Sequence, residues 1–181
     1  MNQPMKIQRR PKGQATLVLF CCALLTASAC KTAAARAESG TEQFDSQMQP
    51  ILRSYLKVGA ALAADSVDGV RAEAKRINKL AAKLDPSSVT GEHASHYEDL
   101  PAKLESASAS LAKSKTLGEA RATYKKLSMP MGMWASMSKL KGVNVVYCPM
   151  AEASWLQEEG AIRNPYYGSS MLRCGQVVEG E

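Results

Sequence analysis

EQFDSQMQPILRSYLKVGAALAA, residues 42–64, decides the fold class of this chain. Its apolar side chains recur at intervals of three and four, which is the spacing of one face of an α-helix. Its composition, rich in Ala and Leu, also favours helix. The spacing predicts a first helix with one buried face. The side chains on that face are Phe44, Met48, Ile51, Leu52, Tyr55, Val58 and Leu62.

The same periodicity continues through three more segments. A second helix is expected over 67–84, because the proline at position 86 disfavours helix in the residue before it. A third should start near Pro101, since proline suits a first helical turn. The pair Thr116 and Glu119 matches a capping box and predicts the start of a fourth, which Pro130 should kink or split.

The helical region should end at Gly142, and the remaining tail has a different pattern. The valines of residues 143–146 predict a short strand that leads into a cysteine-containing loop, and residues 176–178 could pair with it. We therefore expect an all-α domain: an antiparallel four-helix bundle with a C-terminal Cys-containing loop and a small two-stranded hairpin.

The first 29 residues have the pattern of a secretory signal peptide. An apolar stretch at 15–25 follows a basic segment, and small residues at 26–29 precede Cys30. The apolar stretch is shorter than the roughly 18 to 20 residues that a membrane span requires. The basic residues are Lys6, Arg9, Arg10 and Lys12.

Two processing routes fit this signal. Cleavage before a lipidated Cys30 would give a lipoprotein on the periplasmic face of a bacterial membrane, attached through the lipid anchor alone, with residues 30–41 as a flexible tether. Ordinary cleavage would release a soluble periplasmic protein. We expect the lipoprotein, with the functional domain at 42–181 and its Cys/Met loop at 143–178.

The charge balance argues against nucleic-acid binding. The chain has 23 basic and 17 acidic residues, and four of the basic ones lie in the signal. The mature chain would then have 19 basic residues and be close to neutral, whereas nucleic-acid binding requires a basic surface. A cysteine nucleophile with a neighbouring base is not evident either, so we expect no enzymatic activity.

The cysteines and methionines of the tail form the candidate site. Removal of the signal takes away Cys21 and Cys22, which leaves Cys148 and Cys174 in the domain. Met150 and Met171 lie beside them in sequence, and thiolate with thioether sulfur is the ligand set that copper(I) prefers. The alternative is a structural disulfide between the two cysteines, with both methionines as packing groups.

Two other groups are weaker metal candidates. Met129, Met133 and Met137 share one helical face, but methionine is also a common filler of protein cores. His93 and His96 could share one face of a helix, but two histidines do not complete a metal site and exposed histidines are common.

The tail also carries a resemblance to a known family. Quoted as they stand, the matching stretches are Tyr147-Cys148-Pro149-Met150-Ala151, Trp155-Leu156, Ile162-Arg163-Asn164-Pro165-Tyr166-Tyr167-Gly168 and Met171-Leu172-Arg173-Cys174-Gly175, together with the helical stretch 121–128. The chain resembles the domain of unknown function family number 3347, found in exported bacterial proteins and on periplasmic adaptor subunits of heavy-metal efflux pumps. The resemblance implies a helical bundle in a setting of copper or heavy-metal export, with efflux-pump components as partners.

Two hypotheses for function follow. The first is an exported lipoprotein that binds copper(I) through Cys148, Met150, Met171 and Cys174, as a buffer or an accessory to efflux. The second is a protein-interaction module clamped by a disulfide, in which an exposed loop at 164–168 docks a partner.

Overall fold

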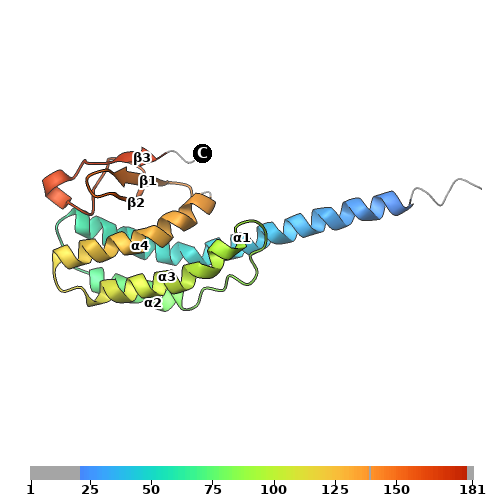
Figure 1. Ribbon diagram of the computed structural model, residues 1–181, viewed down its shortest axis with the longest axis horizontal. Helices are drawn as coiled ribbons and strands as arrows, with labels where there is room; N and C mark the ends of the chain where they lie inside the picture. The colour runs from blue at the N-terminus through green and yellow to red at the C-terminus, as the bar shows by residue number, and fades with distance from the viewer. Residues whose placement is uncertain (1–20, 139, 179–181) are drawn as a thin grey trace, which may run out of the picture. The chain divides into compact units, whose positions relative to one another are not determined.

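The computed structural model describes the backbone of residues 21–138 and 140–178, and the side chains in those ranges from Gly40 onward (Figure 1). The chain divides into two units, residues 1–36 and 37–181, and the candidate site lies in the second. The elements in chain order are α1 (Cys21–Ala63), α2 (Val70–Ala81), α3 (Ala94–Lys113), α4 (Leu117–Met137), β1 (Val143–Cys148), β2 (Ala153–Glu158), the 3₁₀ helix η1 (Gly168–Met171) and β3 (Gln176–Val178).

Helix α1 begins well before the expected residue 42. It is continuous through 30–41, where the sequence predicted a flexible tether, because an Ala-rich segment also has a high helix propensity. Residues 1–20 of the predicted signal lie outside the described residues, so the signal, its cleavage and the lipidation of Cys30 stay predictions. Among the described residues, no helix combines the length and the apolar character that crossing a membrane requires.

Helix α3 starts earlier than expected, at Ala94, and includes Pro101 in its interior. The prediction of a start at Pro101 was wrong because residues 87–99 look polar as a group, although Tyr97 among them and Leu100 directly after them are buried. Burial of these two side chains on the face that also carries Leu104 favours the extra turns of helix.

Helix α4 runs through Pro130 without a break and ends at Met137. The expected split at Pro130 is therefore absent, and both the proline and the neighbouring Met131 are buried in the helical conformation. The predicted N-cap is confirmed, since the Glu119 N–H donates to Thr116 Oγ1 at 3.2 Å. The Glu119 side chain reaches back one residue further than in a capping box, where its Oε2 accepts from the Lys115 N–H at 2.7 Å.

The tail forms a three-stranded antiparallel sheet in the order β2-β1-β3. The predicted pairing of β1 with residues 176–178 is confirmed, with Tyr147 opposite Gln176. Strand β2 was not predicted from the sequence. It follows the turn after Cys148 and pairs with β1, with Val146 opposite Trp155. The predicted all-α class is therefore incomplete, because the domain contains a small three-stranded sheet in addition to four helices.

Four helices are present as predicted, but the sheet takes part in their packing. Helix α2 packs on α3, α3 packs on α4, and α4 also contacts β2. Within the second unit, the sheet lies on the opposite side of α4 from α2 and α3 (Figure 1). All seven α1 positions predicted to face inward are buried, so the periodicity identified the correct face.

Asp45 connects α1 to the end of α4. Its Oδ1 accepts hydrogen bonds from Trp134 Nε1 and from Ser138 Oγ, both at 2.7 Å. Both donors are buried, so each would lose its partner inside the protein if the carboxylate were removed. This one side chain therefore holds the C-terminal end of α4 in place.

We expect Asp45→Ala to lower the free energy of unfolding by about 2 to 3 kcal/mol, because it leaves two buried donors without an acceptor. Asp45→Asn keeps an acceptor oxygen and should lower the free energy of unfolding by less than Asp45→Ala does. Asp68→Ala removes an exposed carboxylate and should change it by less than about 0.5 kcal/mol. Urea unfolding followed by tryptophan fluorescence measures all three, and equal losses for Asp45→Ala and Asp68→Ala would contradict this role.

Candidate functional site

The two cysteines of the domain meet at one end of the sheet. Cys148 is the last residue of β1 and Cys174 lies two residues before β3, so the pairing of these strands brings them together. Their Sγ atoms are 2.9 Å apart, and both are free thiols. Cys148 is 0% exposed and Cys174 is partly exposed, so solvent reaches this pair from the Cys174 side.

The turn after Cys148 stabilises its thiolate. Burial is the largest influence on this thiol and raises its pKa, but hydrogen bonds from Cys174, from the backbone of Ala151 and Met150, and from the Asn164 side chain lower the pKa below its ordinary value. The hydrogen bond with Cys148 raises the pKa of Cys174. Of the two thiols, Cys148 therefore loses its proton more readily, with Cys174 as the S–H donor to it.

Asn164 organises the loop that carries Cys174. Its Nδ2 donates to the Cys174 carbonyl oxygen at 2.8 Å, and its Oδ1 accepts from the backbone N–H of Tyr166 at 2.8 Å and of Tyr167 at 3.3 Å. The Asn164 side chain is fully buried, and Gly168 is buried too. The expectation of an exposed docking loop at 164–168 was therefore wrong, because this segment folds back onto the domain.

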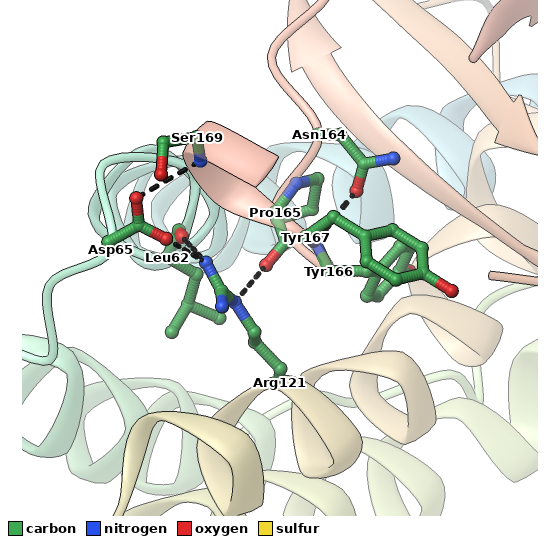
Figure 2. A network of polar contacts seen from close by, with 8 residues as sticks. All are labelled: Leu62, Asp65, Arg121, Asn164, Pro165, Tyr166, Tyr167 and Ser169. Carbon is green, nitrogen blue, oxygen red and sulfur yellow. Dashed lines mark hydrogen bonds and ion pairs between the residues drawn. The ribbon is translucent and has the colours of Figure 1, made fainter. Parts of the chain in front are cut away.

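Arg121 of α4 holds the same loop against the helices (Figure 2). Its Nε donates to the Pro165 carbonyl oxygen at 3.1 Å, and its Nη2 donates to the Leu62 carbonyl oxygen at 2.9 Å and to Asp65 Oδ1 at 2.6 Å. The other carboxylate oxygen of Asp65 accepts from the Ser169 N–H at 3.0 Å. We call these five residues the Arg121 network.

The charge of Asp65 is stabilised within the Arg121 network. Hydrogen bonds from Ser169 and then from Arg121 lower the pKa of its carboxyl group to about 2. Gly168 lies against the pair with φ +57°, and a Cβ atom there would overlap the Asp65 carboxylate and the Arg121 guanidinium. This glycine is therefore required both for its backbone conformation and for the space it leaves.

Aromatic side chains fill the space between this loop and the helices. The Tyr166 ring lies 5.7 Å from Trp155 in an edge-on contact and 6.0 Å from Tyr124, measured between ring centroids. Its hydroxyl donates to the Ser154 carbonyl oxygen at 2.6 Å. The Tyr167 hydroxyl donates to the Met150 carbonyl oxygen at 2.8 Å, and so holds the backbone of the turn that contacts both sulfurs.

Of the four sulfur atoms that were predicted to meet, the two cysteine Sγ atoms lie at contact distance. The Met150 side chain is 63% exposed and its backbone lies beside both cysteine sulfurs. Met171 is partly buried at the end of η1, and its carbonyl oxygen accepts from the Cys174 N–H at 3.0 Å. Coordination by either thioether stays a prediction.

The weaker candidates lie elsewhere. Met129 is 72% exposed, whereas Met133 and Met137 are partly buried and pack against the core. His93 and His96 are exposed at the start of α3, with ring centroids 6.2 Å apart. Across the residues that the structure describes, no group of three or more His, Cys, Asp or Glu side chains is placed to hold a metal ion.

Sequence analysis did not identify the residues that position the tail. Asp65 was assigned no role in positioning the tail, and Arg121 entered only as the first residue of the helical stretch 121–128 in the resemblance. Arg121 donates to the Asp65 carboxylate and to main-chain carbonyl groups, and Asp65 also accepts from the Ser169 N–H. These partners are distant in the sequence, so spacing carries no signal for them. Asn164 and Arg121 both lie in stretches that the resemblance singled out, which was the available signal.

A matched pair of glycine substitutions tests the packing of the Arg121 network. Gly168→Ala places a side chain on a residue with a left-handed backbone, and its Cβ atom would overlap the charged groups of Asp65 and Arg121. It should therefore lower the free energy of unfolding by about 3 kcal/mol or more. Gly69 also has a left-handed backbone, φ +75°, but open space around it, so Gly69→Ala should cost about 1 to 2 kcal/mol. Similar losses in urea unfolding would argue against tight packing at Gly168.

The lowered pKa of Asp65 predicts a dependence of stability on pH. The folded-state value lies below the ordinary 3.8, so the stabilisation is fully present above about pH 4 and is lost as the pH falls through about 2. The difference in unfolding free energy between the wild type and Asp65→Asn should therefore shrink on acidification. Urea titrations between about pH 5 and pH 2 measure it, with Asp68→Asn, outside the Arg121 network, as the control.

Comparison with known proteins supports the resemblance found in the sequence. The sequence model of the family described as protein of unknown function (DUF3347) matches residues 51–141, half of the chain. The match covers most of the helical part and stops before the strands and the thiol pair. No curated protein and no solved structure matches the chain. The chain belongs to the family of proteins of unknown function DUF3347.

Proposed function

We propose that this protein binds copper(I), a soft metal ion, at Cys148 and Cys174, with Met150 and Met171 as further ligands. The observation that carries the proposal is the contact of the two cysteine sulfurs, 2.9 Å apart, although 26 residues separate them in the sequence. Two thiols placed together provide the ligands that soft metal ions select over water and carboxylate oxygen.

The surroundings of Cys148 support the same proposal. A metal ion binds the thiolate and not the thiol, so a site must lower the cost of losing the proton. At Cys148, main-chain N–H groups of the following turn and the Asn164 side chain supply that stabilisation. Donors of this kind also orient the sulfur, as outer-shell partners do at metal centres.

The two thioethers differ in what they could contribute. Met150 extends into solvent beside the pair and could receive an incoming ion, whereas Met171 lies partly buried next to Cys174 in sequence. Thioether sulfur suits copper(I) and persists where thiols oxidise. We further propose that the protein is an exported lipoprotein anchored through Cys30, which buffers copper(I) or transfers it to efflux components.

Competition for copper(I) tests the proposal. The protein is the full chain with Cys21, Cys22 and Cys30 changed to serine, reduced and kept anaerobic, so that Cys148 and Cys174 are its remaining thiols. We expect one equivalent of copper(I) to be retained against a competing chelator, and Cys148→Ser or Cys174→Ser to abolish retention because a thiolate ligand is lost.

Methionine variants test the completeness of the ligand set. Met150→Leu and Met171→Leu should each weaken copper(I) binding at least about tenfold, whereas the exposed Met129 of α4 supplies a matched control, Met129→Leu, with unchanged affinity. If the wild type fails to compete with the chelator, the copper proposal is wrong. If both methionine variants bind as the wild type does, the site consists of the two thiols alone.

The same sulfur contact favours a second candidate function, a disulfide clamp on the tail. An exported protein folds in an oxidising compartment, where neighbouring thiols form disulfides. A bond between Cys148 and Cys174 would hold the loop that carries η1 against β1 even without the Arg121 network. Because 164–168 is largely buried, this candidate no longer includes docking of a partner through that loop.

Protein isolated from cells without reductant tests the clamp. We expect it to have two fewer free thiols before reduction than after it. The oxidised form should be more stable than the reduced form by about 3 to 4 kcal/mol, since the bond closes a loop between residues 26 positions apart. Equal thiol counts before and after reduction would exclude the clamp, and urea unfolding of both forms measures its contribution.

A further inference from the structure

The two sulfurs of the pair differ in access to solvent. The Cys148 side chain is 0% exposed, so an ion that arrives from solution meets Cys174 before it reaches the Cys148 sulfur. Cys174 is partly exposed, and its Sγ touches Cys148 Sγ at 2.9 Å. An oxidant therefore meets one sulfur, and a second sulfur lies behind it at contact distance.

We infer that this pair reduces copper(II) to copper(I), using the accessible Cys174 as the entry point and the covered Cys148 as the second electron donor. The inference rests on the proposed function only in taking copper as the metal at this site. The overall step converts two copper(II) ions and one dithiol into two copper(I) ions, one disulfide and two protons. Two electrons leave the sulfurs, one for each copper ion, and the S–H protons go to water.

The contact geometry explains how the second electron is released. When Cys174 loses its proton and one electron to the first copper(II) ion, its sulfur becomes a thiyl radical. The Cys148 thiol, already in contact, releases its proton to water and forms the S–S bond with it, and the resulting radical anion passes its extra electron to a second copper(II) ion. Because both sulfurs are held in place, the bond forms within one chain and needs no encounter between chains.

The turn at Met150 favours copper as the oxidant. The exposed thioether belongs to the residue whose backbone lies beside both sulfurs, and Tyr167 holds that backbone through the Met150 carbonyl oxygen. Thioether sulfur stabilises copper(I) relative to copper(II), which makes the reduction more favourable. The product ion is thus released next to a ligand of its own chemistry, while the thiols that reduced it are consumed.

The experiment adds copper(II) sulfate anaerobically to the reduced full chain with Cys21, Cys22 and Cys30 as serine, together with a chromogenic chelator of copper(I). The wild-type pair should yield two copper(I) ions per chain, lose both thiols and stay monomeric with an internal disulfide by intact mass.

Cys148→Ser should yield no more than one copper(I) per chain and accumulate disulfide-linked dimers. Cys174→Ser should react at an initial rate at least about tenfold lower, because its remaining sulfur is covered.

Circular dichroism of each variant checks that the helices are intact, and urea-unfolded Cys174→Ser should recover a fast reaction, since unfolding uncovers Cys148. The inference is overturned if the wild-type pair yields one copper(I) or none per chain, or if folded Cys174→Ser reacts as fast as the wild type. Retention of copper(I) without reduction of copper(II) would remove this inference and leave the proposed function. Reduction of copper(II) without retention of copper(I) would support this inference and remove the proposed function.

Discussion

The position of the whole tail depends on the guanidinium group of Arg121. Its Nε and Nη2 atoms reach Pro165 of the tail and, near the end of α1, the Leu62 carbonyl oxygen and the Asp65 carboxylate, so one planar cation connects α4 to two segments that are distant from it in the sequence. A flat group with donors in a fixed fork suits this task better than the single ammonium group of a lysine would. The carboxylate then holds Ser169 at the start of η1, and the loop to Cys174 follows.

The properties of the thiol pair arise from the elements around it. Pairing of β1 with β3 decides that the cysteines meet, and the turn between β1 and β2 directs main-chain N–H groups at Cys148. Packing of Trp155 and Tyr166 covers the same end of the sheet. The result is one buried thiol whose pKa is lowered and one accessible thiol, an asymmetry that suits both ion binding and electron transfer.

Some predictions from sequence were accurate because their physical cause is local. The face of α1 follows from the helical repeat, and the cap at Thr116 follows from a side chain that reaches its own first turn. The wrong start at Pro101 and the absent split at Pro130 have the opposite cause, since burial outweighed the local cost of proline in both helices. Strand β2 was missed because its pattern is short and follows the cysteine turn directly.

By itself, the sequence determined that the chain builds four helices, that its tail differs from them, and that two cysteines with nearby methionines lie in that tail. These features depend on residue type and on spacing along the chain. Only the tertiary structure decided that the two sulfurs touch, that one of them is covered, and that Asp65, Arg121 and Asn164 hold the loop in place. Such contacts join residues far apart in sequence, and the free energy that selects them comes from burial and charge pairing in the folded domain.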